Sequence, residues 1–528
     1  MTKRFFSACS LILLIGTNVF SQNNIQLLSS LVIQGQRLAG CWHYADTTGH
    51  EYALIGAEQG IVFLDITDPS QPTQLFQLPG NTSIWHEVKV MGHYAYAVSE
   101  GVDTGNVKNG VQIMDLRYLP DSVPYKFWQG DGLIQGQLVK AHSITADSGF
   151  IYVNGHNINS LGNGVLICSI ADPWNPAFVG AVVNNYSHDS YVRGTRLYSS
   201  EIFAGQFSIY DITNPASPAL LASQVTPGAF NHNSWLNDAG TVLFTTDEQN
   251  NAPVASYDIT DVSNITLLDQ YLTLTTPNKE VHNVRVINDY LVNPSYGSQL
   301  TIADVSRPGN IIEVGSYPTG SFLCWDADPY LESGAVLATD MNSQTVFLFQ
   351  PNYVRACYLE GTVTDSITGI PLANVQVALA ATTSIKNTGV DGRYSTGAST
   401  PGVWDAIFSK SGYRSKTVSG INLVSGQLTP LDVELAPNNI AVGEISNLDS
   451  WMIHPQPADD YLAFDLKSRS EISFKICGLG GNMIKEGRIN PSSAAKAIID
   501  TDEIPSGVYL LTLKTTHGLA AGKITIMH

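Results

Sequence analysis

Short hydrophobic strands separated by turn residues fill residues 37 to 350, and no segment there has helical spacing of its apolar positions. Alternating apolar residues bounded by Gly, Asn and Pro are typical of β-strands and turns. In most repeats one strand ends in a version of the phrase Asp-Ile-Thr-Asp-Pro, clearest at 60–69 and 207–215. The anchor positions of seven repeats, 65, 115, 169, 211, 258, 304 and 349, are 42 to 54 residues apart. This period predicts a seven-bladed β-propeller with four strands in each blade.

The repeated aspartate, as at Asp65 and Asp211, has a structural interpretation. An Asp that opens a turn accepts a hydrogen bond from the main chain two residues later. The proline that follows ends the strand because it cannot donate to the sheet ladder. We therefore expect these aspartates to cap turns and not to take part in catalysis.

Closure of the ring can also be predicted. The seventh repeat stops after its third strand, near residue 349, and lacks an outer strand. The hydrophobic segment 25–34 is an orphan with the pattern of the outer strand 219–225. We expect residues 25–34 to complete the seventh blade, which would remove an exposed sheet edge.

Two further segments, each with its own sequence pattern, follow the propeller. Residues 357–377, with Asp391-Gly392 and Gly412-Tyr413 after them, resemble the carboxypeptidase regulatory-like domain. The resemblance implies a small prealbumin-like β-sandwich with no catalytic residues. The segments 453–462, 476–484 and 499–511 resemble the C-terminal sorting domain of type IX secretion, although Gln456 stands where that family usually has Asn.

The first residues have the features of a secretory signal peptide. Lys3 and Arg4 precede an apolar run at 5–15, and a cut after Ser21 fits the pattern. That run is too short to span a bilayer, and no other segment approaches 18 apolar residues, so we expect no transmembrane helix. We divide the chain into a signal peptide at 1–21, a propeller at 22–355, a regulatory-like β-sandwich at 356–437, a linker at 438–446 and a small β-sandwich sorting domain at 447–528.

The charge of the mature chain narrows its partners. Removal of Lys3 and Arg4 leaves 27 − 2 = 25 basic residues against 46 acidic ones, a net charge of 25 − 46 = −21. So acidic a protein is a poor partner for nucleic acid and for anionic lipid. An extracellular glycan, a protein or a small molecule remain as partners.

The propeller repeats resemble the LVIVD-repeat family, and the layout is similar to choice-of-anchor B proteins, in which one propeller carries different C-terminal attachment devices. The resemblance covers residues 25–350 and rests on the repeated Asp-Ile-Thr-Asp-Pro phrase. With the sorting domain, it implies that residues 447–528 engage the type IX secretion machinery. The protein would then be secreted, or held at the outer-membrane surface of a Gram-negative bacterium of the Bacteroidota type. The resemblance implies no settled activity.

The candidate functional residues occupy two further positions that are equivalent in all the repeats. The start of the first strand carries an aromatic residue in every blade, and a mostly acidic position follows 13 to 15 residues later. The first strand of a blade is innermost, and the start of one antiparallel strand lies beside the end of the next. The first set is His43, His86, His142, His188, His232, His282 and Trp325, and the second is Glu58, Glu100, His156, Glu201, Asp247, Tyr296 and Asp340.

These two sets predict a ring at the mouth of the central channel, with two interpretations. In one, imidazoles hold a divalent metal or an anionic ligand while carboxylates behind them fix the tautomers. Zn, Ni or Cu would suit the imidazoles, and Ca would suit the carboxylates. In the other, each His pairs with a carboxylate and ties blades together without a ligand. The metal ligands that we select are His86, His142, His188 and His232.

Three functions follow from the ring. The first is a binding module with its ligand at the channel mouth. The second is a metal-dependent enzyme of hydrolase or oxidase type, with metal-bound water as nucleophile and Glu100 or Glu201 as base. The third is an adhesive protein that binds through its blade rims or its β-sandwich.

Overall fold

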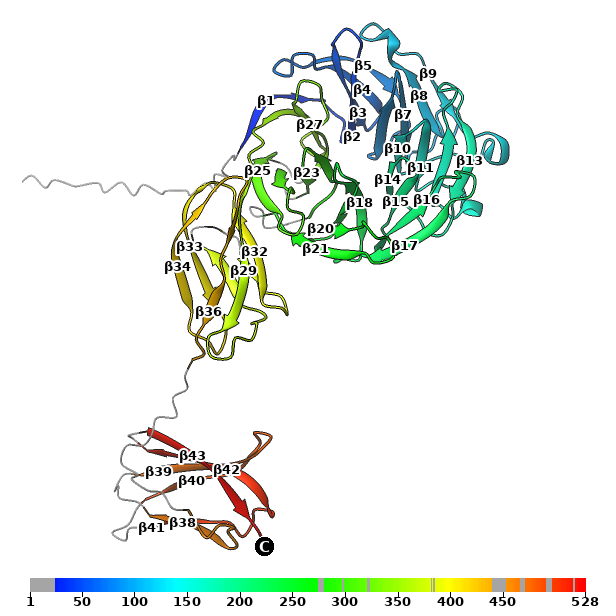
Figure 1. The fold of residues 1–528 in the computed structure, drawn as a ribbon. Coiled ribbons are helices and arrows are strands. Elements are labelled where there is room, and N and C mark those ends of the chain that lie inside the picture. Colours follow the sequence, from blue (N-terminus) through cyan, green and yellow to red (C-terminus); the bar gives the residue numbers. More distant parts are fainter. Residues whose placement is uncertain are drawn as a thin grey trace, which may run out of the picture. The chain divides into compact units, whose positions relative to one another are not determined.

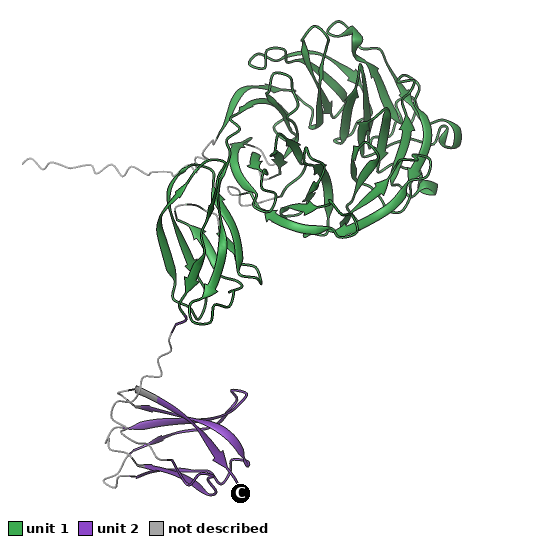
Figure 2. Cartoon of the chain, in the orientation of Figure 1, with its two compact units in different colours: residues 1–436 green, residues 437–528 purple. Residues whose placement is uncertain are grey.

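The computed structural model describes residues 24–273, 280–296, 299–320, 323–380, 382, 385–438, 453–465, 471–490, 496–515 and 518–528. The predicted signal peptide at 1–21 and most of the predicted linker at 438–446 lie outside these residues. The chain forms two compact units, residues 1–436 and 437–528 (Figure 2). The finer division into a propeller, a sandwich, a linker and a sorting domain stays a prediction. No helix in the described residues is long and apolar enough to cross a membrane.

Seven four-stranded antiparallel sheets follow one another round a central axis, as the coloured ribbon shows (Figure 1). The predicted all-β propeller is confirmed. The sheets are β2 (Leu38–Ala45), β3 (Glu51–Ala57), β4 (Gly60–Asp65), β5 (Thr73–Pro79); β6 (His86–Met91), β7 (Tyr94–Ser99), β8 (Val111–Asp115), β9 (Tyr125–Trp128); β10 (Ser143–Asp147), β11 (Phe150–Asn154), β12 (Val165–Ser169), β13 (Ala177–Val182); β14 (Asp189–Arg193), β15 (Arg196–Glu201), β16 (Gln206–Asp211), β17 (Ala219–Val225); β18 (Asn231–Leu236), β19 (Val242–Asp247), β20 (Val254–Asp258), β21 (Thr266–Tyr271); β22 (Arg285–Ile287), β23 (Tyr290–Ser295), β24 (Gln299–Asp304), β25 (Ile312–Pro318); and β26 (Cys324–Asp328), β27 (Val336–Asp340), β28 (Thr345–Pro351), β1 (Ile25–Val32). Short 3₁₀ turns occur at η1 (Leu116–Tyr118), η2 (Gly132–Ile134) and η3 (Asn159–Leu161).

The last blade is built from both ends of the propeller. The N-terminal strand β1 pairs antiparallel with β28, from Ile25 opposite Pro351 to Val32 opposite Thr345. Figure 1 shows the blue β1 in the same blade as the green β27. Ile25 is buried in one core cluster with Phe349. The predicted closure by residues 25–34 is therefore confirmed.

The repeated aspartates cap turns, as the sequence predicts. Asp65 accepts a hydrogen bond from the main-chain N–H of Thr67 at 3.0 Å, and Asp211 accepts one from Thr213 at 2.8 Å. The bond from Thr213 lowers the pKa of Asp211. The carboxylates thus satisfy backbone donors where each third strand ends.

Irregular pairing at the start of three inner strands shapes the channel. The ladder of β18 with β19 skips His232, that of β26 with β27 skips Trp325, and that of β2 with β3 skips residues 39–40. A bulge of this kind takes a residue out of the ladder and re-aims its side chain. His232 and Trp325 therefore leave the regular alternation of their strands at one end of the channel.

A β-sandwich follows the propeller within the same compact unit. One sheet has the order β32-β29-β35, with β36 also paired to β29, and the other has the order β31-β30-β33-β34. Ion pairs join the sandwich to the propeller, including Arg307 with Glu360 at 2.8 Å and Lys386 with Asp269 at 3.0 Å. Its strands are β29 (Cys357–Asp365), β30 (Gln376–Leu379), β31 (Ile385–Asn387), β32 (Arg393–Ala398), β33 (Gly402–Ser409), β34 (Lys416–Leu423), β35 (Leu428–Pro430) and β36 (Val433–Leu435).

The second unit is also a small β-sandwich. Its sheets have the orders β37-β38-β41 and β40-β39-β42-β43. Buried side chains from both sheets, such as Leu462 and Leu511, form its core. Its strands are β37 (Ile453–His454), β38 (Tyr461–Asp465), β39 (Ile472–Gly478), β40 (Met483–Ile489), β41 (Lys496–Asp500), β42 (Gly507–Thr515) and β43 (Gly518–Ile526).

Closure by β1 should make one face of that strand important for stability. The substitution Ile25→Ala should lower the unfolding free energy of the propeller by about 2–4 kcal/mol, because it empties a buried site in the closing blade. Val32→Ala on the same strand, where the side chain is 53% exposed, should change it by less than about 0.5 kcal/mol. Urea unfolding followed by tryptophan fluorescence measures both. Equal effects of the two substitutions would contradict closure through β1.

Candidate metal centre at one end of the channel

Aromatic side chains form an arc at the start of the inner strands. The rings of His142 and His188 have centroids 3.9 Å apart, and those of His188 and His232 are 4.3 Å apart. The arc continues from His232 to His282 at 4.1 Å and from His282 to Trp325 at 4.5 Å. The structure therefore brings five of the seven predicted aromatic positions into one continuous row of contacts.

His86 is buried at the start of β6 and is held separately. Its Nδ1 lies 3.2 Å from the carbonyl oxygen of Ser83. Burial lowers the pKa of His86 to about 4, so this imidazole is neutral at pH 7.

His43 does not lie with the other histidines. In β2 it is Ala39 that lies beside Trp325, in a small cluster with Met341. His43 is four residues farther along the strand, and its Nδ1 lies 2.8 Å from the Asp328 carboxylate. Burial lowers the pKa of His43, but the Asp328 carboxylate outweighs it and the net shift is upward. Aligning the repeats on their histidines was wrong in this blade, where Ala39 and not His43 lies beside the arc.

Main-chain carbonyls of the next blade orient two of the imidazoles. The Nδ1 of His232 lies 3.1 Å from the carbonyl oxygen of His282, and the Nδ1 of His282 donates to the carbonyl oxygen of Trp325. A carbonyl can only accept, so Nδ1 carries the hydrogen in both rings. The Nε2 atom of each ring is left with a lone pair, which is the form that binds a metal.

The same histidines are held in the neutral state. Burial lowers the pKa of His188, His232 and His282 well below the ordinary value, and positive charge on neighbouring imidazoles would lower it further. Neutral imidazole is the ligand that Zn and related metals require. In His232 and His282, whose Nδ1 carries the hydrogen, no proton has to be displaced from Nε2 at neutral pH.

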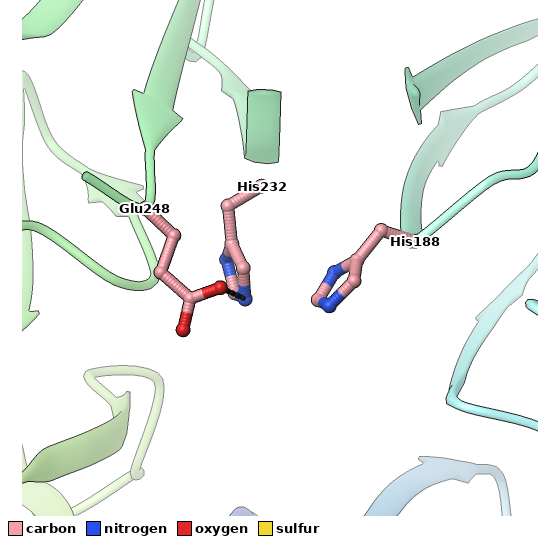
Figure 3. A group of neighbouring side chains, drawn as sticks. All are labelled: His188, His232 and Glu248. Carbon is pink, nitrogen blue, oxygen red and sulfur yellow. Dashed lines mark ion pairs between the residues drawn. The ribbon is translucent and has the colours of Figure 1, made fainter. Parts of the chain in front are cut away.

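His188, His232 and Glu248 form a group that could hold a metal. One ligand atom from each lies within 4.8 Å of the other two. The two imidazoles project toward a common space and the Glu248 carboxylate reaches the His232 ring (Figure 3), with Nε2 and Oε2 3.8 Å apart. Ligands about 2.1 Å from a tetrahedral metal are roughly 3.4 Å apart, so small rotations would complete the site.

The electrostatics of Glu248 favour a cation. Burial raises the pKa of Glu248 to about 7, although its hydrogen bond with Tyr296 opposes the rise. Ionised carboxylate is therefore disfavoured in this site unless positive charge is close. A bound divalent ion would supply that charge.

The predicted ring of carboxylates is mostly dispersed into local contacts. Only Glu100 binds a histidine of the arc, with its Oε1 2.5 Å from Nδ1 of His142, while Tyr296 stacks on His282 at 4.4 Å. The other predicted members hold nearby groups: Glu58 pairs with Arg37, His156 accepts from the N–H of Ile158, Glu201 accepts from Asn185 and Gln206, Asp247 accepts from Thr226 and Phe230, and Asp340 accepts from Ser343.

Glu248 is the residue that sequence reasoning missed. Alignment of the second strands selects its neighbour Asp247, whose carboxylate instead accepts three hydrogen bonds from the turn at 226–230. The signal was present, because no other blade has two adjacent acidic residues at this position. One residue past the strand, a side chain points to the opposite side.

Family models match three parts of the chain. The LVIVD repeat matches residues 50–78, 202–226 and 280–319. The carboxypeptidase regulatory-like domain matches residues 358–436, and the secretion-system C-terminal sorting domain matches residues 452–527. No curated protein matches the chain.

Solved structures show a general likeness. A computationally designed protein, Ika8, is 10% identical with a TM-score of 0.42, covering 62% of this chain and 99% of its own. The WD40 β-propeller domain of Doa1 is 11% identical with a TM-score of 0.45, covering 62% and 97%. A putative 6-phosphogluconolactonase from Bacteroides uniformis is 12% identical with a TM-score of 0.45, covering 64% and 95%. These similarities carry no functional information.

Stability should depend on pH through His156. Burial lowers the pKa of His156 to about 4, and protonation of Nδ1 would break its hydrogen bond with Ile158. The unfolded imidazole binds a proton near pH 6.5, so its stabilising contribution is present above that pH and is lost as the pH falls toward 4. His156→Gln should remove about 2–3 kcal/mol of the stability difference between pH 7 and pH 4.5, at about 1.4 kcal/mol per pKa unit.

Urea unfolding at a series of pH values measures this slope. His50→Gln is the matched control, since His50 lies exposed in the turn between β2 and β3, and its profile should follow the wild type. A His156→Gln profile that also follows the wild type would refute the assignment.

Proposed function

Since the chain is an exported LVIVD-repeat β-propeller with a carboxypeptidase regulatory-like domain and a type IX sorting domain, we propose that it is a surface binding module with a divalent metal at the channel mouth. The metal ligands would be His188, His232 and Glu248. The observation that carries the proposal is the convergence of one ligand atom from each residue within 4.8 Å.

The chemistry of the ligand set favours a first-row transition metal. Two imidazole nitrogens and one carboxylate oxygen suit Zn, Ni or Cu, whereas Ca takes six to eight oxygen ligands. Of the four ligands that the sequence suggests, this proposal keeps His188 and His232 and replaces His86 and His142 with Glu248.

Three protein ligands would leave an open coordination position, which is where a binding module would take an anionic group of its ligand. The neighbouring His142 and His282 line the same space. The metal would thus hold a ligand that the rim of the channel then selects by shape.

An enzyme is the second candidate, and one observation favours it. Glu100 and His142 form a carboxylate–imidazole pair, and the His142 ring lies 3.9 Å from the ring of His188. Such a pair beside a metal-activated water is the arrangement of a general base. Glu201 is less suited to that role, because Asn185 and Gln206 already donate to its carboxylate.

The sorting domain accounts for the export of the binding module. Its presence supports recognition by the type IX machinery. Retention at the outer-membrane surface and release into the medium are both compatible with this route. We propose the surface, because the choice-of-anchor layout pairs a propeller with an attachment device.

Metal content tests the proposed centre directly. The full chain, purified without a His tag, should contain close to one equivalent of Zn, Ni or Cu by elemental analysis. His232→Ala and Glu248→Gln should each lower the affinity for the metal by at least about tenfold, because each removes one of three ligands. A competition assay with a chromogenic chelator measures this affinity.

His43→Ala is the matched control, since that histidine is bonded to Asp328 away from the centre. It should keep the full metal content. Wild-type protein that takes up no transition metal, or a Glu248→Gln variant with unchanged affinity, would overturn the proposed centre.

The open position can be tested with cobalt. Co(II) substituted into the site should give a visible absorption spectrum that azide changes, because azide occupies the free position. Glu100→Gln should leave this spectral change intact, since Glu100 contacts His142 and is not a proposed ligand. A spectrum that azide cannot alter would indicate a closed, structural metal site.

A further inference from the structure

A second concave site lies farther along the inner strands, away from the histidine arc. A cavity of about 200 Å³ is lined by residues that include Trp42, Lys89, Tyr191, Trp235 and Tyr330. Lys89, Tyr191 and Trp235 each come three residues after a histidine of the predicted ring. Three residues of a strand span about 10 Å, so this aromatic pocket is separate from the proposed metal centre.

The walls of the aromatic pocket are half-buried rings, of which Trp235 and Tyr330 are nearly parallel at 22° and two other pairs are tilted. Tyr191 and Trp235 have centroids 4.3 Å apart and planes tilted by 48°. Trp42 and Tyr330 are 6.0 Å apart with planes tilted by 43°. The tilted pairs present ring faces in more than one direction, which gives a puckered ring several aromatic faces to pack against.

Each of the two tryptophan rings already has a cationic side chain packed against it. The Nζ of Lys89 lies 4.4 Å from the ring centroid of Trp42, and the Arg285 guanidinium lies 4.7 Å from that of Trp235. A cation attracted to these rings would meet two like charges. The pocket therefore disfavours quaternary ammonium and methylated-lysine ligands, which are the usual occupants of aromatic cages.

Polar groups at the edge can serve hydroxyls. An ammonium has three N–H donors, and Lys89 places one on the carbonyl oxygen of Val88 at 3.2 Å, while the Glu87 carboxylate is 3.7 Å away. The hydroxyl of Thr145 donates to the carbonyl oxygen of Ser190 at 2.7 Å and keeps its lone pairs as acceptors. Asp147 adds a carboxylate to the lining.

We propose that the aromatic pocket binds one pyranose residue of an extracellular glycan. One face of a pyranose is made of C–H groups, which pack on the aromatic faces by dispersion, while its hydroxyls both donate and accept. The cavity is smaller than the 300–1,000 Å³ or so that holds a drug-sized ligand, so it admits a single ring. The inference does not depend on the proposed metal centre.

Titration with methyl pyranosides tests the proposal. The full chain is labelled with 5-fluorotryptophan and titrated with the methyl glycosides of a hexose, an N-acetylhexosamine and a hexuronic acid. At least one sugar should saturate at millimolar concentration and shift the fluorine resonances of Trp42 and Trp235, assigned with the variants Trp42→Phe and Trp235→Phe. The resonance of Trp174 should stay in place.

Matched variants separate recognition from folding. Lys89→Met keeps the aliphatic part of the side chain over Trp42 and should lower the affinity for the sugar at least about tenfold. Lys126→Met removes the corresponding lysine over Trp174, where Nζ is 5.3 Å from the ring centroid, and should leave affinity unchanged. Metal chelation should leave it unchanged as well.

Three results would overturn the inference. One is the absence of saturable shifts at Trp42 and Trp235 with every sugar. Another is equal sugar affinity in the wild type, in Lys89→Met and in Lys126→Met, with all three folded by thermal melting. Sugar binding that chelation abolishes would also overturn it, because the ligand would then sit at the metal.

Discussion

The packing of each blade against its two neighbours is the constraint on which the propeller depends. A blade has apolar faces on both sides, and the core clusters join strands of adjacent blades, as Tyr96 with Ile144 shows. An open ring would leave two such faces in water and a free sheet edge beside them. The pairing of β1 with β28 prevents this, so the first and last strands of the propeller share one blade and close the ring.

Closure also creates an axis where side chains of all blades meet. The space there is filled by buried polar groups, including the ion pair of Arg285 with Asp326 at 3.0 Å and the hydrogen bond from Asn283 to Asp326 at 2.8 Å. Charged groups in such a place remain only when they are paired. Arg285 of this network also lies against Trp235, a wall of the aromatic pocket.

Much of this architecture could be predicted from the sequence, because it depends on repeated local signals. The Asp-Ile-Thr-Asp-Pro phrase predicts the number of blades and the capped turns, and the unpaired hydrophobic segment at 25–34 predicts how the ring closes. The site was harder. In the first blade Ala39 lies beside Trp325, and His43 is four residues farther along β2, so the residue type misled the alignment. The choice between Asp247 and Glu248 depends on where β19 ends, which is the least predictable property of a strand. The aromatic pocket was not predicted, because its rings come from different blades and only the fold brings them together.

The bonds from His232 to the carbonyl of His282, and from His282 to that of Trp325, have a mechanical meaning. The main chain of the neighbouring blade fixes the orientation of each imidazole, so this orientation depends on the relative position of the two blades. A shift of one blade against the next would turn an imidazole and carry its Nε2 out of line. The orientation of these two imidazoles therefore depends on how adjacent blades pack against each other.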